Sequence, residues 1–457
     1  MLTVIDPRTG TVVEEVPSLD ASGTGEAIGR AAAAFDDWRR RSFAERASVL
    51  HAVAGRMRDE MDHLAPLMTE EMGKPIKESR GEVEKAAWAA EHYAEHAERY
   101  LSTEEIASDA TRSYVQYLPL GPILGILPWN APFWLAFRFC APALMAGNTC
   151  LMKHDPHVPK CARAIADLFD ESVGAPPGIM QALLLETPDV EAASRDPRVR
   201  AVSFTGSDRA GAAVASVAAS EIKPAVLELG GSDPCIVLAD ADLETAASII
   251  AKSRIINAGQ SCIAAKRVIV EEPVHDRFVE LLEAQLRPLV VGDPRDEATD
   301  VGPLARADLR DALHRQVRQT VDAGATCRMG GEIPEGDGFF YPVTLLTGVT
   351  NDMTACAEET FGPVAVVMSA SSADEALRIA NDTPYGLAAS VWTSTDRGEA
   401  MAADIEAGQV VVNGIVKTDP RLPSGGIKRS GYGRELGPHG IHEFVNAQQV
   451  WVGPSTA

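Results

Sequence analysis

Hydrophobic residues in the N-terminal part of the chain recur mainly with helical spacing. After short strand-like runs around the turn at Thr9-Gly10, apolar residues repeat at intervals of three and four over long segments. Residues alternate instead in Thr111–Leu118, which is typical of an exposed strand or hairpin arm. The helical pattern predicts helices over Asp20–Arg40, Phe43–Glu71 and Glu78–Tyr100.

Beyond residue 120, strand-like and helical patterns follow one another in turn. Gly121–Leu127 alternates Gly or Pro with Ile and Leu, and a second series runs from Ile236 to about Asn413. This alternation predicts an α/β fold whose parallel sheets carry helices on both faces. The predicted strands include Thr149–Lys153, Met180–Leu185, Ala201–Phe204, Ala225–Leu229 and Val268–Val270. The predicted helices are Lys160–Val173, Asp189–Arg195, Ala210–Ser220, Leu243–Asn257, Val274–Leu289, Asp308–Ala323, Ala373–Thr383 and Asp396–Glu406.

One apolar stretch, Ala131–Met152, has about the length of a membrane span. It contains Arg138 and Asn148 as well as two prolines, and it lacks flanking aromatic and basic anchors. We therefore expect a core helix over Phe133–Met145 and no membrane partner.

Composition excludes several classes of function. The 457 residues hold 42 Lys and Arg against 65 Asp and Glu, and the formal charge of −23 would repel a nucleic acid backbone. The seven cysteines show no close spacing, so neither a disulfide framework nor a metal site is predicted. With no signal peptide pattern at Met1–Gly10, a reducing cytoplasm is the expected location.

The stretch Asn257–Arg267 is the candidate for the chemistry, with Cys262 as its nucleophile. A thiol attacks efficiently when the backbone lets it stand clear of the core and nearby charge favours the thiolate. Gly259 and the small Ser261 supply that backbone freedom. The alternative is a buried free cysteine beside a turn, and the stretch alone favours that alternative.

Other motifs also place reactive or ligand-binding groups beside glycines. Glu228 ends an apolar strand and precedes Gly230-Gly231, and a buried glutamate whose pKa is raised suits a general base. Phe204–Ser207 joins a strand to a helix containing Gly211, as a pyrophosphate site requires, although ordinary turns share this pattern. Glu358–Pro363 and Gly425–Arg434 are two further charged, glycine-containing loops, and solvated surface turns are the alternative for each.

Together these motifs resemble the aldehyde dehydrogenase superfamily, and most closely its bacterial succinate-semialdehyde dehydrogenases. The resemblance extends from Pro7 to Trp451. It implies that the Cys262 thiolate attacks an aldehyde, that the Asn130 amide and the Cys262 N–H hold the oxyanion, and that Glu228 activates water for thioester hydrolysis. The motifs that carry it are Pro128-Trp129-Asn130, Phe204–Ser207, Glu228–Gly231, Gly259–Cys262 and Glu359–Pro363.

The resemblance also implies a nicotinamide cofactor, NAD or NADP. Pro156 stands where NAD-preferring relatives often have a glutamate, which weakens repulsion of a 2′-phosphate, but Asp155 could compensate. The choice between the two cofactors therefore stays open. The implied cofactor-binding residues are Trp129, Lys153, Gly206, Ser207, Gly211, Glu359 and Phe361.

For the substrate, the resemblance points to succinic semialdehyde or a related aldehyde that bears a carboxylate. Arg138 is the expected cation for that carboxylate, and a structural ion pair is its alternative. Ala131 and Ser424 replace bulkier residues of many relatives, which leaves a bulkier or aromatic aldehyde open. A coenzyme A-acylating enzyme and a non-catalytic homologue are further alternatives. The expected substrate-binding residues are Arg138, Trp134, Leu135, Ser261, Ile263 and Ser424, with Arg421 at the edge.

The fold expected from the resemblance has two Rossmann-like parallel-sheet lobes plus a small β arm for oligomerisation. Residues 1–100 and 120–230 would form the dinucleotide-binding domain and 231–430 the catalytic domain. Residues 101–119 and 431–457 would form the arm of a homodimer or homotetramer.

Overall fold

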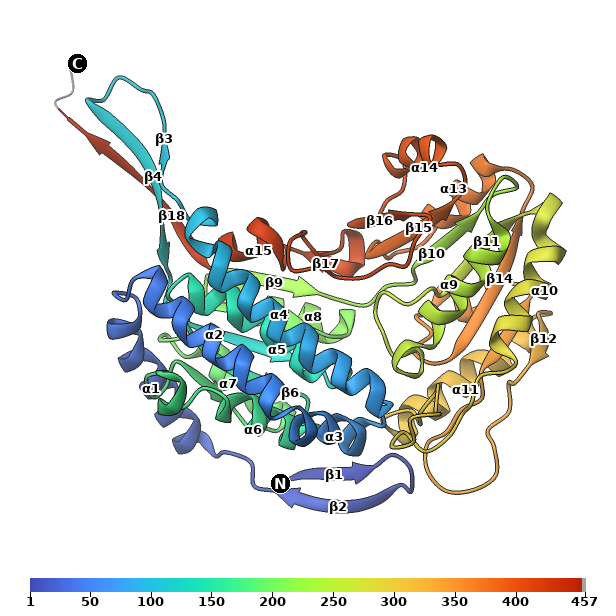
Figure 1. The fold of residues 1–457 in the computed structure, drawn as a ribbon, viewed down its shortest axis with the longest axis horizontal. Coiled ribbons are helices and arrows are strands. Elements are labelled where there is room, and N and C mark those ends of the chain that lie inside the picture. The colour runs from blue at the N-terminus through green and yellow to red at the C-terminus, as the bar shows by residue number, and fades with distance from the viewer. Residues whose placement is uncertain (454–457) are drawn as a thin grey trace.

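The structure is a computed structural model that describes residues 1–453. Two lobes lie side by side, a short hairpin runs along their lower edge, and a β arm projects from the first lobe (Figure 1). The predicted fold of two parallel-sheet lobes and an arm is confirmed. Residues 454–457 of the predicted arm lie outside the described residues.

The first lobe is built on a six-stranded sheet in the order β17-β9-β8-β5-β6-β7. Its strands run parallel except for β17, which pairs antiparallel with β9. The chain enters this sheet at β5, continues to β6 and β7 on one side, and then returns to β8 and β9 on the other side of β5. The carboxyl ends of β5 and β8 therefore flank the switch point, which is where such sheets bind ligands. The strands are β5 (Pro122–Leu127), β6 (Thr149–His154), β7 (Met180–Ala182), β8 (Ala201–Thr205), β9 (Ala225–Glu228) and β17 (Gly431–Tyr432).

Helices cover both faces of this sheet, because each face carries its own hydrophobic core. One face packs against α5 and α6, with α2, α3 and α4 outside them, and the other face packs against α1, α7 and α8. The helices are α1 (Ala21–Trp38), α2 (Phe43–Asp59), α3 (Met61–Met72), α4 (Ile76–Tyr100), α5 (Pro132–Met145), α6 (Pro159–Asp167), α7 (Val190–Arg195) and α8 (Asp208–Ser220).

The apolar stretch Ala131–Met152 contains helix α5 and the first residues of strand β6. Every residue of α5 is buried, as expected for a core helix. Within residues 1–453, each helix is too short or too polar to cross a bilayer.

Two predicted helices are shorter in the structure. The single helix predicted over Phe43–Glu71 is two helices, because Glu60 (φ −96°, ψ 13°) leaves the helical conformation. The helix predicted over Lys160–Val173 ends at Asp167, and Asp170 then caps a short 3₁₀ turn by accepting from the Ser172 N–H. Apolar spacing continues through both breaks, so periodicity alone does not reveal them.

The second lobe contains a seven-stranded sheet in the order β12-β13-β14-β11-β10-β15-β16. Only β12 among these described strands runs antiparallel to its neighbour. The strands are β10 (Pro234–Val237), β11 (Arg267–Glu271), β12 (Thr326–Met329), β13 (Thr344–Thr347), β14 (Val364–Ala370), β15 (Ala388–Trp392) and β16 (Gln409–Val412). The helices are α9 (Leu243–Ile255), α10 (His275–Leu286), α11 (Ala307–Asp322), α12 (Thr354–Ala357), α13 (Ala373–Asn381) and α14 (Thr395–Ala402).

The arm is a three-stranded antiparallel sheet of β3 (Glu104–Glu105), β4 (Arg112–Pro119) and β18 (Val445–Val452). Its C-terminal boundary differs from the expected one. Strand β17 belongs to the sheet of the first lobe, and α15 (Gly437–His442) packs against α4, so only β18 of this segment pairs within the arm.

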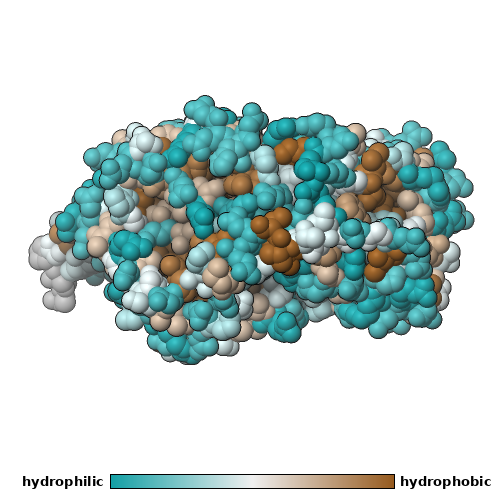
Figure 2. Space-filling model, turned by 90° about the horizontal axis from the view of Figure 1, so that it is seen from below, coloured by the Kyte–Doolittle hydropathy of each residue, from teal (hydrophilic) through white to brown (hydrophobic). Residues whose placement is uncertain are grey.

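The N-terminal hairpin of β1 (Leu2–Asp6) and β2 (Thr11–Val16) links the two lobes at their lower edge. The Phe339 N–H of the second lobe donates to the Pro7 carbonyl at 2.8 Å. On the face seen in Figure 2, hydrophilic residues cover most of the surface and hydrophobic residues form separate groups among them.

Candidate active site

The loop that carries Cys262 begins with an unusual backbone turn. Helix α9 ends at Ile255, and Asn257, Ala258 and Gly259 then adopt left-handed φ values of 55°, 54° and 74°. This conformation costs roughly 1 kcal/mol or more for a residue with a Cβ, so the surroundings must hold it in place. At Gly259 a Cβ would overlap the Gly362 carbonyl, so only glycine fits there.

Arg254 holds this turn from inside the second lobe. Its side chain is fully buried, and its guanidinium donates to the carbonyls of Gly259 at 2.9 Å, Ala265 at 3.4 Å and Gly362. Burial lowers the pKa of Arg254 to about 10, which still leaves it charged at neutral pH. The arginine therefore ties the Cys262 loop to the loop that follows Glu359. The sequence analysis did not anticipate this role, and its only signal was an arginine near the end of a mostly apolar helix.

Asn130 lies after the carboxyl end of β5, and it contacts the Cys262 loop from the other lobe. The Asn130 side-chain amide donates to the Gln260 carbonyl at 3.0 Å. In return, the Asn257 side-chain amide donates to the Asn130 carbonyl at 2.7 Å, and so does the Lys74 ammonium at 3.0 Å. The structure thus brings the predicted oxyanion amide next to the predicted nucleophile loop.

Helix α4 supplies two carboxylates that support this contact, the buried Glu82 and the partly buried Glu78. Glu82 pairs with Lys74 and accepts from the N–H groups of Phe133 at 2.9 Å and Trp134 at 3.2 Å, which satisfies the start of α5. Glu78 accepts from the Asn257 N–H at 2.7 Å, and burial raises the pKa of Glu78 to about 7. Neither role could be predicted from sequence, because both residues lie on a helix distant in sequence from the loop that they hold.

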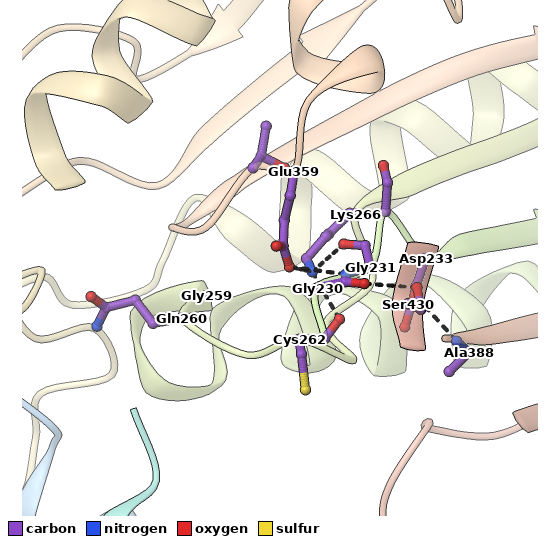
Figure 3. A network of polar contacts seen from close by, with 12 residues as sticks. Gly230, Gly231, Asp233, Gly259, Gln260, Cys262, Lys266, Glu359, Ala388 and Ser430 are labelled. Atoms are coloured by element: carbon purple, nitrogen blue, oxygen red, sulfur yellow. Dashed lines mark hydrogen bonds and ion pairs between the residues drawn. The ribbon is translucent and has the colours of Figure 1, made fainter. Parts of the chain in front are cut away.

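The Cys262 side chain points away from the polar network around Lys266 (Figure 3). The residue is partly exposed, but the protein around its thiol raises the pKa of Cys262 to about 11, with Lys266 and then Arg138 acting in the opposite direction. The resting nucleophile is therefore a thiol at neutral pH, and its activation requires a base.

Glu228 has the environment of such a base. Its side chain is buried at the end of β9, where Oε2 accepts from Arg138 at 3.1 Å and Oε1 has no partner among the described residues. Burial raises the pKa of Glu228 to about 7, although Arg138 opposes the shift. A carboxyl group with this pKa accepts and releases protons near neutral pH.

Arg138 is paired within the protein. Besides Glu228, its guanidinium contacts Glu435 at 2.5 Å, and all three side chains are at least 95% buried. Glu435 follows β17, which the C-terminal segment brings alongside β9. Both contacts use Nη2, and Nε has no partner among the described residues, so contact with a substrate carboxylate stays a prediction beside this ion pair.

A second lysine, Lys266, anchors Glu359. The Lys266 ammonium donates to Glu359 Oε1 at 2.5 Å, to the Gly231 carbonyl at 2.5 Å and to the Cys262 carbonyl at 2.8 Å, and Figure 3 shows these contacts converging. The Gly231 N–H also donates to Glu359 Oε1 at 3.3 Å. A side chain at Gly230 would collide with Glu359, which explains the glycine there. Lys266 thus links the nucleophile loop to a predicted cofactor residue, a role the sequence did not indicate.

The carboxyl edge of the first sheet has the groups that a dinucleotide needs. Lys153 is buried at the end of β6, its ammonium has no ion pair or hydrogen bond among the described residues, and the buried Thr205 hydroxyl is also unpartnered. Gly206 and Ser207 follow β8, and Ser207 caps α8. A free cation and a helix start at the switch point suit an anionic cofactor.

Other predicted cofactor residues lie on both lobes. Trp129 meets Phe361 edge to face, with ring centroids 5.8 Å apart. Gly211 has a packing role, because a Cβ there would collide with Leu229, the residue that follows β9.

The remaining predicted substrate residues divide into two groups. Ser261 and Ile263 flank Cys262 and are partly exposed, whereas Trp134 and Leu135 are largely buried in the first turn of α5. Ser424 is also buried, and its backbone pairs with that of Glu435 at 2.7 and 2.8 Å. Ser424 thus lies beside the Arg138 ion pair.

Comparison with known proteins places this arrangement in a family. The model of the aldehyde dehydrogenase family matches residues 1–450. The NADP(+) succinate-semialdehyde dehydrogenase of Mycobacterium avium is 46% identical over 459 residues, which cover 99% of this chain and 97% of that protein. A probable NADP(+) succinate-semialdehyde dehydrogenase of Synechocystis sp. is 46% identical and covers 99% of both chains.

A solved structure agrees with these matches. The succinic semialdehyde dehydrogenase of Streptococcus pyogenes in complex with NADP+ superposes with a TM-score of 0.96 at 35% identity, over 99% of this chain and 100% of that one. The chain belongs to the aldehyde dehydrogenase family.

Proposed function

We propose that this protein oxidises succinic semialdehyde, or a closely related aldehyde that bears a carboxylate, to the carboxylic acid with NADP as the preferred cofactor. The observation that carries the proposal is the 3.0 Å contact between the Asn130 side-chain amide and the Gln260 carbonyl of the Cys262 loop. The similarity to succinate-semialdehyde dehydrogenases supports the substrate class.

The first half of the reaction forms a covalent bond to sulfur. Glu228 in its ionised form takes the thiol proton, and the Cys262 thiolate attacks the aldehyde carbon. The carbonyl oxygen becomes an oxyanion that the Asn130 amide and the Cys262 N–H stabilise as hydrogen-bond donors. Because Asn130 is held by Lys74 and Asn257, its amide is positioned before the substrate arrives.

A nicotinamide cofactor, when bound, supplies the acceptor for the hydride whose loss leaves a thioester on Cys262. Lys153, Ser207, Trp129 and Glu359 are the residues that would hold this cofactor. Glu228 first releases the thiol proton to solvent and then removes a proton from water, and the resulting hydroxide attacks the thioester carbon. The carbon–sulfur bond breaks to release the acid and the Cys262 thiolate, which takes the proton back from Glu228. The net change adds one water to the aldehyde, removes a hydride and releases one proton.

The preference for NADP rests on the region after β6. Asp155 accepts from the His157 N–H at 3.0 Å and lies 3.8 Å from Arg306, so contacts within the protein already engage its carboxylate. Pro156 adds no charge, and Lys153 is a cation without a carboxylate partner among the described residues. A 2′-phosphate therefore meets little repulsion at this edge.

The test is a steady-state assay with both cofactors and several aldehydes. The proposal predicts higher kcat/KM with NADP+ than with NAD+, and higher kcat/KM for succinic semialdehyde than for benzaldehyde. Pro156→Glu should reverse or reduce the cofactor preference. No turnover of any aldehyde would exclude the proposed activity, and a requirement for coenzyme A would favour an acylating enzyme instead.

We also propose that the chain forms a homo-oligomer through its arm. The arm exposes large apolar side chains, including Ile106 at 52%, Trp451 at 39% and Val452 at 42%. The outer strands leave backbone groups free for pairing with another subunit. Light scattering after size exclusion tests this assembly, and a monomer at micromolar concentration would contradict it.

A further inference from the structure

His157, in the loop after β6, makes a hydrogen bond that crosses between the two lobes. Its imidazole Nε2 donates to the Ala305 carbonyl at 2.9 Å, and both residues are buried. Ala305 belongs to the segment that leads into α11 of the second lobe, yet it packs within the hydrophobic core of the first lobe. His157 therefore fixes a part of the second lobe against the carboxyl edge of the first sheet.

The segment that ends at Ala305 is packed closely against the first lobe along its length. Residues 301–305 are all buried. A Cβ on Gly302 would overlap the Gly73 carbonyl, and a Cβ on Gly73 would press against Pro303. Backbone contact alone therefore sets the distance between the lobes at Gly302, whereas at Ala305 a side-chain hydrogen bond from His157 completes the contact.

The His157 imidazole carries a single proton. Burial lowers the pKa of His157, with Asp155 acting in the opposite direction, so the ring is neutral at neutral pH. A carbonyl oxygen can only accept, which places the proton on Nε2. The loop itself is also fixed, because the His157 N–H donates to Asp155 Oδ1 at 3.0 Å and the Asp155 N–H donates to the Leu127 carbonyl at 2.8 Å.

Ala305 contacts the nucleophile loop as well. Its N–H donates to Gln260 Oε1 at 3.0 Å, and Gln260 Nε2 donates to the Asn257 carbonyl at 3.1 Å. The Gln260 side chain is buried and extends away from the network around Lys266 (Figure 3). Because the Gln260 backbone carbonyl accepts from the Asn130 amide at 3.0 Å, hydrogen bonds connect Ala305 with Asn130 through Gln260.

The contact with Gln260 bears on the direction of the Asn130 amide. A primary amide has two N–H donors, and the Gln260 carbonyl accepts from one of them. The other N–H is left for the oxyanion. Its direction depends on where the Gln260 carbonyl lies, and a small displacement of such a donor weakens stabilisation of the transition state.

We propose that His157 is a positioning residue, whose hydrogen bond to Ala305 holds Gln260 and thereby orients the Asn130 amide toward the oxyanion. This inference rests on the proposed role of Asn130 in aldehyde oxidation. His157 acts through Ala305 and Gln260 and takes no part in the bond-making steps.

The first experiment removes the donor and then restores it. In His157→Leu, kcat should fall by about tenfold while KM for the aldehyde stays within about threefold, because the alignment matters in the transition state. Alkylation of Cys262 by iodoacetamide should stay within about twofold of wild type, since the thiol keeps its surroundings. His157→Gln places an amide N–H near the position of imidazole Nε2 and should keep most of kcat. His63→Leu, at an exposed position on α3, is the matched control and should behave as wild type.

The second experiment tests whether His157 acts through Asn130. Asn130→Ala by itself should lower kcat by about 10²- to 10³-fold, because it removes an oxyanion donor. Adding His157→Leu to Asn130→Ala should lower kcat by no more than about twofold further, since the group that His157 positions is already absent. Circular dichroism of each variant is the folding control.

A full tenfold loss in the Asn130→Ala background would overturn the inference, because His157 would then act on another group. An unchanged kcat in His157→Leu, or an equal loss in His157→Gln, would overturn it as well. If His157→Leu does not fold, His157→Asn is compared with His157→Gln, since both carry an amide and only the longer one reaches Ala305. A wild-type enzyme that oxidises no aldehyde contradicts the proposed function, whereas an active wild type that these variants match contradicts the role of His157 alone.

Discussion

The Arg138 guanidinium donates to the Glu228 carboxylate at 3.1 Å, and both side chains are buried between the first sheet and α5. Because Glu435 shares the same arginine, two carboxylates face one cation. Burial and the neighbouring Glu435 keep Glu228 within reach of protonation at neutral pH, although Arg138 acts in the opposite direction.

Replacing Glu228 by glutamine should remove the base. Burial raises the pKa of Glu228 to about 7, so wild-type kcat should rise with pH through this value as the carboxyl group ionises. Glu228→Gln should lower kcat by about 10²- to 10⁴-fold and abolish that rise. Steady-state rates between pH 5 and 9 measure both effects, and a variant that keeps the wild-type pH profile would assign the base elsewhere.

Cys262→Ala should abolish aldehyde oxidation. Loss of the nucleophile is expected to reduce kcat by roughly 10⁴-fold or more, because the thioester can no longer form. Formation of the reduced cofactor is the measurement, and Cys327→Ser, at an exposed cysteine of β12, is the matched control. Full activity in Cys262→Ala would show that another residue attacks the aldehyde.

Lys266→Met should raise the pKa of the Cys262 thiol and weaken cofactor binding. Lys266 is the strongest influence lowering the pKa of Cys262, so its removal should raise that pKa and slow alkylation by iodoacetamide at pH 8 by roughly tenfold. Glu359 loses its ion pair as well, so KM for the cofactor should increase. Alkylation with Cys262→Ala as the background, together with circular dichroism as the folding control, tests this prediction. An unchanged alkylation rate in folded protein would contradict it.

Glu78→Gln should alter how stability depends on pH. Burial raises the pKa of Glu78 to about 7 in the folded protein, whereas the unfolded chain titrates near its ordinary value of 4.5. The folded state therefore holds a proton more tightly, and this contribution to wild-type stability is complete below about pH 4.5 and lost as pH rises through about 7.

Glutamine does not titrate, so the free energy of unfolding of wild type relative to Glu78→Gln should fall by about 3 kcal/mol between pH 4.5 and 8. Urea unfolding at several pH values gives this difference, and Glu98→Gln, on the exposed side of the same helix, is the control. Parallel pH profiles for wild type and Glu78→Gln would mean that folding leaves the pKa of Glu78 unchanged.

Much of this protein could be predicted from local sequence. The spacing of apolar residues predicted most helices and strands because burial of one face imposes a period on each element. The motifs around Cys262, Glu228 and Asn130 were sufficient to name the candidate catalytic groups and the family. The sequence did not reveal the break at Glu60, where the apolar spacing continues although the backbone leaves the helix.

Only the tertiary structure decided which buried cation pairs with which carboxylate. Arg138 meets Glu228 and Glu435, and Lys266 meets Glu359, across long stretches of chain. Periodicity states that a face is buried, but it does not state which element covers that face, and the partner of a buried charge depends on that neighbour. For the same reason the sequence left a substrate carboxylate and a structural ion pair as alternatives for Arg138, and only the pairing of β17 with β9 brings Glu435 to it.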